Sequence, residues 1–255
     1  MTAGIYEVDE AFRLAEALEL DFVELTYDVC DFLPNAQPAK RVQALSRATG
    51  VEVSVHLPFV DLNIASLIET VRRATVEQTC RALEYSARVG AQCAVLHTGT
   101  RFIYQPRPVG DAIAALYQSL SELPDTPTPV ALENLGLYVD GVVREPTALR
   151  EVTRHMNLHN CLDFGHAHIE GGGASACHDF ISAYISTLGQ DIIHLHLCNN
   201  DGLSDLHTAT PDGTVAYERY AAYLQDFPGT ICLEVAGGPD SVRRSAEHIR
   251  SLRAL

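Results

Sequence analysis

The chain has 255 residues, and its 33 acidic and 18 basic side chains give it a formal net charge of −15 at pH 7. Hydrophobic residues make up 47% and charged residues 20%, which is typical of a folded globular protein and excludes a disordered one. No run of about 18 apolar residues could span a membrane, and the N-terminal sequence lacks the pattern of a signal peptide. The seven cysteines form no C-x-x-C pair. We therefore expect a cytoplasmic protein without a membrane partner.

The charge balance also bears on possible partners. Proteins that bind a phosphate backbone usually present clustered Lys and Arg side chains. Here Lys40 is the only lysine, and the arginines are mostly scattered. A small-molecule substrate is therefore favoured over a nucleic acid, although a local cluster of arginines would still allow nucleic-acid binding. The sequence does not indicate an oligomeric state.

Short apolar runs alternate with segments of helical periodicity along the whole chain. Strands are expected at residues 22–26, 52–55, 93–96, 129–132, 159–162, 192–197 and 230–233, with a weaker one near 3–6. Helices are expected at about residues 9–19, 38–48, 66–89, 108–122, 145–154, 177–188, 215–225 and 239–253. This alternation predicts a single α/β domain, a (β/α)8 TIM barrel over residues 1–255. A doubly wound open sheet is the alternative, but its usual Gly-rich phosphate turn is absent.

The C-terminal ends of six expected strands carry histidines or carboxylates. In a TIM barrel the catalytic groups come from these strand ends and from the loops that follow them. Any one such residue is more often structural than functional, but six strands that share the feature at one end indicate a common site. The residues are His56, His97, Glu133, Asp163, His166, His194, His196, Asp205, His207 and Glu234.

Imidazole and carboxylate ligands without thiolates suit zinc, manganese, magnesium or iron. The set is larger than one ion needs, because zinc sites generally use three or four protein ligands. Two or three ions that share carboxylates are therefore the more economical interpretation. Ions at such close spacing can activate water and stabilise both the attacking and the leaving oxygen of an ester.

Seven motifs resemble those of the xylose-isomerase-like barrels, a superfamily that includes endonuclease IV and many sugar isomerases and epimerases. They are HLPFVDLN (56–63), LHTG (96–99), LENLG (132–136), CLDFGHAH (161–168), HLHLCNND (194–201), SDLH (204–207) and CLEV (232–235). None is decisive alone, but their order and spacing resemble the family over most of the chain. The resemblance implies a metal-dependent TIM-barrel enzyme.

The endonuclease IV pattern implies a site with three zinc ions and hydrolysis of a phosphoester by activated water. Of the two neighbouring histidines, His196 is the favoured ligand because it lies nearer the strand end, and His194 is expected to support it or to face the substrate. The implied ligands are His56, His97, Glu133, Asp163, His166, His196, Asp205, His207 and Glu234. The acidic net charge favours a small phosphoester over DNA.

The isomerase and epimerase branch implies a different site, with one ion, for which manganese or magnesium is also possible. Glu133 and Glu234 would then take and return a proton next to a sugar carbonyl. The ion would be held by Glu133, Asp163, His196 and Glu234. This chemistry does not need the additional residues His56, His97, Asp205 and His207, which favour the first interpretation.

Further residues are candidates for contact with the substrate. Phe59 stands where endonuclease IV carries an aromatic residue that enters DNA, and Glu24 and Arg101 lie near other strand ends, as does His194. A third possibility is a barrel that binds a ligand without turnover, although costly buried polar groups are seldom kept without a ligand.

Overall fold

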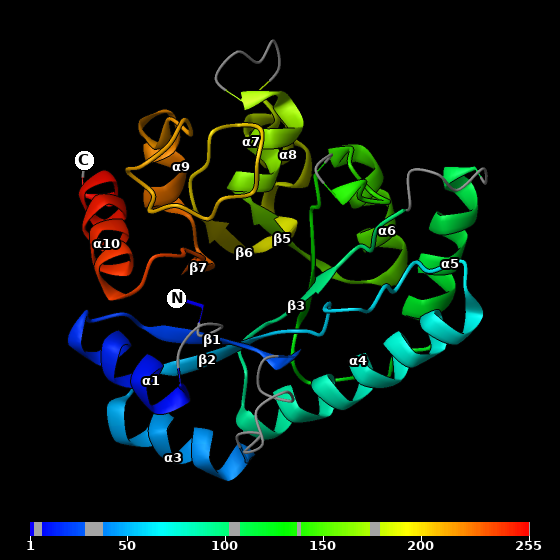
Figure 1. Cartoon of the computed structure of the whole chain (residues 1–255), viewed down its shortest axis with the longest axis horizontal. Helices are drawn as coiled ribbons and strands as arrows, with labels where there is room; N and C mark the ends of the chain where they lie inside the picture. Colours follow the sequence, from blue (N-terminus) through cyan, green and yellow to red (C-terminus); the bar gives the residue numbers. More distant parts are fainter. Residues whose placement is uncertain (3–6, 29–37, 102–107, 137–138, 174–178, 255) are drawn as a thin grey trace.

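The structure is a computed structural model that describes residues 1–2, 7–28, 38–101, 108–136, 139–173 and 179–254. Seven parallel strands pair in chain order in one sheet, and helices surround it (Figure 1). The strands are β1 (Phe22–Thr26), β2 (Glu52–His56), β3 (Ala94–His97), β4 (Val130–Glu133), β5 (His159–Asp163), β6 (Ile192–Leu197) and β7 (Thr230–Leu233). The predicted α/β TIM barrel is confirmed.

The N-terminus connects the first and last strands. The backbone N–H of Thr2 donates a hydrogen bond to the carbonyl oxygen of Leu233 in β7, at 3.1 Å. The backbone N–H of Glu24 in β1 donates one to the carbonyl oxygen of Met1, at 2.7 Å. The first two residues therefore lie between β1 and β7, where the N-terminus is marked in Figure 1. The eighth strand expected near residues 3–6 falls outside the described residues.

The helices follow the expected order with small differences at their ends. They are α1 (Val8–Ala17), α3 (Ala39–Thr49), α4 (Glu69–Val89), α5 (Val109–Ser121), α6 (Pro146–Met156), α7 (Phe164–Gly171), α8 (Phe180–Leu188), α9 (Ala221–Asp226) and α10 (Pro239–Arg253), with 3-10 turns η3 (Gly189–Asp191) and η4 (Tyr217–Tyr220). None of the described helices combines the length and the hydrophobicity needed to cross a membrane.

Helix α7 was not expected from the sequence. Its eight residues include two glycines and are too few for a clear helical periodicity. The helix begins directly after β5 because the side chain of Asp163 accepts a hydrogen bond from the backbone N–H of His166, at 2.5 Å. The same contact places the side chains of both residues at the C-terminal end of the barrel.

The barrel interior below the strand ends holds small side chains. Cys93, Val95, Ala131 and Cys161 form a separate buried cluster, apart from the larger core between the strands and the helices. Residues two positions apart in a strand share a face, so Val95 and Ala131 lie one layer beneath His97 and Glu133. These side chains fill the interior and support the polar groups above them.

Asp179 joins α8 to η4. Its carboxylate accepts hydrogen bonds from the backbone N–H of Ser182 at 3.0 Å and from the hydroxyl of Tyr220 at 2.8 Å, so it caps the helix and tethers a distant segment. We expect Asp179→Ala to lower the free energy of unfolding by about 1–2 kcal/mol. Thermal unfolding should show a fall of about 2–8 °C in Tm, whereas the exposed control Asp226→Ala should change it by less than about 2 °C.

Candidate metal centre

Nine side chains meet at the C-terminal end of the barrel and form three groups. In each group every residue offers a ligand atom, and these atoms lie within 4.8 Å of one another. Strand register brings them together: His97 in β3 pairs with Glu133 in β4, and Asp163 in β5 pairs with His196 in β6. The groups are His56, His97 and Glu133; Glu133, Asp163, His196 and Glu234; and His166, Asp205 and His207.

The first group surrounds one oxygen of Glu133. Nε2 of His56 lies 3.4 Å and Nε2 of His97 lies 3.3 Å from Oε2 of Glu133. The other ring nitrogen of His56, Nδ1, lies 2.9 Å from the carbonyl oxygen of Leu57. This contact orients the ring and turns Nε2 toward the carboxylate.

The second group uses the other oxygen of Glu133. Nδ1 of His196 lies 3.4 Å from Oε1 of Glu133 and 3.1 Å from Oε2 of Glu234. Asp163 completes the group and is fully buried. Glu133 therefore offers one oxygen to each of two groups, as a carboxylate that bridges two ions does.

The third group comes from helix α7, which follows β5, and from the loop after β6. Oδ2 of Asp205 lies 3.0 Å from Nε2 of His207 and 3.5 Å from Nε2 of His166. Nδ1 of His166 lies 2.9 Å from the carbonyl oxygen of Asn134, and Nδ1 of His207 lies 2.8 Å from that of Glu234. His207 has a φ of 48°, in the left-handed region that side chains seldom adopt.

These side chains fit divalent ions. Two ligands at zinc–nitrogen or zinc–oxygen distances around one tetrahedral ion are about 3.3 Å apart, close to the contacts within the groups. In the described part of the chain, several buried atoms of the groups have no hydrogen-bond partner, which is expected of atoms that face an ion. They are Oε2 of Glu133, Oδ2 of Asp163, Nδ1 of His196, Oδ1 of Asp205 and Oε2 of Glu234.

The electrostatics of the site couple metal binding to protons. Burial raises the pKa of Asp163 to about 7, although the neighbouring His166 lowers it. Burial also tends to raise the pKa of Glu133, but His196 and His97 outweigh it and hold that pKa well below its usual value. Glu133 is therefore ionised at neutral pH, while Asp163 still binds a proton in part of the molecules.

Metal affinity is expected to rise with pH through about 7. A cation binds the ionised form of Asp163, so below the raised pKa it must displace a proton, and this proton alone lowers the affinity up to about tenfold per pH unit. The same shift makes the metal-free protein less stable as pH rises from about 4 to about 7, because the folded state disfavours the ionised carboxyl and holds its proton to a higher pH than the unfolded state. Competition titration with cobalt between about pH 5.5 and pH 8 should show the rise in affinity. Asp163→Asn should make this profile less steep but not flat, because neighbouring carboxylates also raise the pKa values of the ligands His166 and His196. A flat wild-type profile would contradict the prediction.

Phe59 lies over the first group. Its ring centroid is 4.9 Å from that of His56 and 4.8 Å from that of His97, and 39% of the residue is exposed. The carboxylate of Asp28 accepts hydrogen bonds from the backbone N–H groups of Phe59 and Val60, at 2.5 and 2.7 Å, and so fixes this turn. The ring stands where it could cover a bound substrate.

The other three residues suggested for substrate contact lie elsewhere. Glu24 and His194 are fully buried in the barrel interior and do not line the cavity at the strand ends. Arg101 is partly exposed and forms an ion pair with Asp140, at 3.2 Å. Phe59 lines the cavity at the strand ends, whereas Glu24, His194 and Arg101 do not.

A cavity of about 330 Å³ opens beside the first group. Apolar side chains form much of its wall, and its described lining contains no Lys or Arg. Ligand-type residues from all three groups also reach it, among them His97, Glu133, His166, Asp205 and Glu234. A small molecule in this cavity would therefore lie next to bound ions.

Sequence reasoning missed one cluster. Cys232 in β7 lies with Glu24, His194 and His196 in a fourth group, whose ligand-type atoms are also within 4.8 Å of one another. The sequence offered a signal, because Cys232 is two residues before Glu234 and therefore shares its inward face. An apolar strand with a cysteine nevertheless suggests a small buried hydrophobe first.

Comparison with known proteins identifies the family. A family model described as xylose isomerase-like TIM barrel matches residues 12–252, so the chain belongs to this family. The uncharacterized protein MJ1311 of Methanocaldococcus jannaschii is 29% identical over 202 residues, which are 76% of this chain and 67% of the relative. The enzymes among the solved relatives include epimerases and endonuclease IV.

Two solved structures illustrate the range of the family. A D-tagatose 3-epimerase-like protein is 27% identical with a TM-score of 0.78, over 91% of this chain and 88% of that chain. Endonuclease IV from Thermus thermophilus is 19% identical with a TM-score of 0.75, over 99% and 96%. The second likeness concerns the fold alone.

Proposed function

We propose that the protein is a metal-dependent hydrolase of small phosphoesters with a centre for three divalent ions, with zinc the best fit. The observation that carries this proposal is the arrangement of nine ligand-type residues in three groups, two of which share Glu133. When bound, such ions lower the pKa of water and neutralise charge on the attacking and leaving oxygens of an ester. The protein's own residues hold the ions, exclude bulk water and shape the substrate cavity.

The charges of the site match this substrate. Three divalent ions carry six positive charges, while the ligands supply four carboxylates and five histidines that bind as neutral imidazoles. The loaded centre would keep two positive charges, which favour a phosphoester anion. In the alternative with a single ion, the second group would combine two positive charges with three carboxylates. This site would carry a net negative charge, which disfavours an anionic substrate.

The cavity and the surface favour a small substrate. A volume of about 330 Å³ holds a small organic molecule, and the apolar wall near Phe59 suits an uncharged leaving group. The net charge is −15, and the described lining of the cavity contains no Lys or Arg to contact a phosphate backbone, which disfavours a nucleic acid as the substrate.

A sugar or sugar-phosphate epimerase is the second candidate. It is supported by the D-tagatose 3-epimerase-like structure at 27% identity and by the second group, which holds Glu133 and Glu234 together with Asp163 and His196. The two glutamates would then remove and return a proton next to a carbonyl. This reaction needs neither His56 nor His97.

One comparison separates the two candidates. Zinc-loaded protein is assayed for release of nitrophenolate from mono- and bis-nitrophenyl phosphate, and for exchange of C–H hydrogen with deuterium in a panel of ketoses and aldoses. Hydrolysis that is lost in His97→Ala supports the three-ion hydrolase. Deuterium exchange that survives in His97→Ala but is lost in Glu133→Gln and Glu234→Gln would overturn it in favour of the epimerase.

A further inference from the structure

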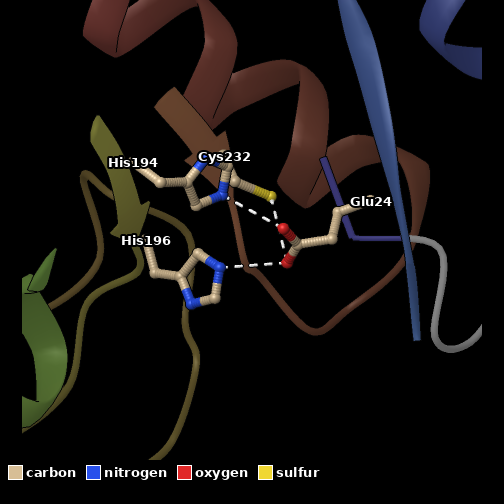
Figure 2. A group of neighbouring side chains, drawn as sticks. All are labelled: Glu24, His194, His196 and Cys232. Carbon is tan, nitrogen blue, oxygen red and sulfur yellow. Dashed lines mark hydrogen bonds and ion pairs between the residues drawn. The ribbon is translucent and has the colours of Figure 1, made fainter. Parts of the chain in front are cut away.

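Beneath the metal centre, four fully buried side chains meet inside the barrel. Glu24 of β1 faces His194 and His196 of β6 and Cys232 of β7 (Figure 2). Nε2 of His194 lies 3.0 Å from Oε2 of Glu24, and Nε2 of His196 lies 2.9 Å from Oε1. The carboxylate has no access to solvent or to the substrate cavity, so its role must pass through its neighbours.

His196 differs from the other histidines of the centre in the nitrogen that it presents. His56, His166 and His207 each direct Nδ1 at a backbone carbonyl oxygen and Nε2 at a carboxylate of their group, although Nδ1 of His166 also lies 3.2 Å from Oε1 of Glu133. His196 does the reverse: Nδ1 faces Glu133 and Nε2 faces Glu24. An imidazole that binds an ion through Nδ1 keeps its proton on Nε2, where it needs an acceptor.

The carboxylate of Glu24 is itself held in place. The hydroxyl of Ser54 in β2 donates a hydrogen bond to Oε2, at 3.0 Å, and His194 contacts the same oxygen. Nδ1 of His194 lies 2.5 Å from the hydroxyl of Thr230 in β7. Burial of a carboxylate costs several kcal/mol unless partners compensate it. An interior position with partners from three strands therefore indicates a specific role.

We propose that Glu24 is a positioning residue of the metal centre. Its carboxylate accepts the Nε2 proton of His196, fixes the ring and its tautomer, and thereby presents Nδ1 to the ion of the second group. A ligating histidine that donates its other N–H to a carboxylate is a more basic ligand than one that donates to a backbone carbonyl oxygen. The inference rests on the metal centre of the proposed function, but not on the reaction that the centre catalyses.

A fourth ion bound by Glu24, His194, His196 and Cys232 is the competing explanation. It has some geometric support, because Nε2 of both histidines lacks a well-aligned hydrogen-bond acceptor among the described residues. The contacts of Glu24 favour a shared proton, because Oε2 also accepts a hydrogen bond from the hydroxyl of Ser54, at 3.0 Å, as a carboxylate in a hydrogen-bond network does. The thiol of Cys232, 3.9 Å from Oε1 of Glu24, is at the distance of a weak hydrogen bond.

Cobalt titration of Glu24→Gln tests the proposal. Gln keeps the size of the side chain but removes the charge, so one cobalt equivalent should bind about 10–100-fold more weakly while the others keep their affinity. The metal-free variant should still unfold in one cooperative transition, which separates a loss of metal affinity from a loss of the fold. A loss spread equally over all equivalents, or no loss at all, would overturn the proposal. If Glu24→Gln does not fold, Glu24→Asp provides the same test. The shorter side chain keeps the charge but moves the carboxylate away from Nε2 of His196.

Cys232→Ser is the matched control for a fourth ion. If Glu24 acts on His196, this variant binds the same number of cobalt ions with unchanged affinity, and wild-type cobalt protein shows no thiolate charge-transfer absorption in the near ultraviolet. Such a band, lost in Cys232→Ser together with one equivalent of cobalt, would overturn the proposal. Wild-type protein that binds no cobalt would refute the proposed function itself, whereas normal binding in Glu24→Gln would refute only the role of Glu24.

Discussion

Glu133→Gln is expected to lower the rate of phosphoester hydrolysis about 1,000-fold and to reduce the number of bound ions. Oε2 of Glu133 contacts His56 and His97, and Oε1 contacts His196. The substitution of Glu133 therefore affects two ligand groups. Glutamine keeps one carbonyl oxygen but no charge and cannot bridge two cations. Interactions that stabilise charge in a transition state are worth about 100–1,000-fold each. Steady-state kinetics and metal analysis of the same preparation measure both effects.

The control for this variant is Glu151→Gln, which changes an exposed glutamate of α6. It should keep the wild-type rate and ion count. Hydrolysis in Glu133→Gln within about tenfold of wild type, with an unchanged ion count, would show that Glu133 does not bridge two ions.

Removal of the metal is expected to lower Tm by about 8–16 °C or more. At a concentration 1,000 times its Kd, one ion stabilises the folded state by about 4 kcal/mol. For a chain of this size, each kcal/mol corresponds to about 2–4 °C. The effect is large because Glu133, Asp163 and Glu234 converge in one group, where a single cation contacts all three carboxylates.

Differential scanning calorimetry of zinc-loaded and chelator-treated protein at pH 7.5 measures this effect. Zinc added back in excess of the chelator should restore the transition. In Glu133→Gln the difference between the two forms should shrink, because fewer ions bind. Identical transitions for loaded and stripped wild-type protein would mean that no ion binds to the folded state with useful affinity.

Much of the fold could be predicted because the strands carry a simple signal. Residues 22–26, 192–197 and 230–233 are strands as expected, since strands covered on both faces read as short apolar runs. Helix α7 could not be predicted, because it depends on the contact from Asp163 to the backbone of His166, which becomes visible only in three dimensions. The expected helix from residue 177 is α8, which begins at Phe180 after its cap, Asp179.

The ligand-type residues were visible for a similar reason. Parallel strands bring their C-terminal ends to one rim, so His97 and Glu133 meet although a whole helix separates them in the chain. The sequence could not show which nitrogen His196 would direct at the ligands. It also could not show that Glu24, placed early in the chain, would lie behind that histidine, because both depend on the closed barrel, in which side chains of β1 and β6 meet in the interior.

Anomalous diffraction from crystals of the zinc-loaded protein tests the central claim most directly, since it both counts and locates the ions. We expect three peaks at the zinc edge, one in each group, with Glu133 between two of them and no peak next to Cys232. A single peak in the group of Glu133, Asp163, His196 and Glu234, at full zinc loading, would contradict the three-ion centre and the hydrolase built on it.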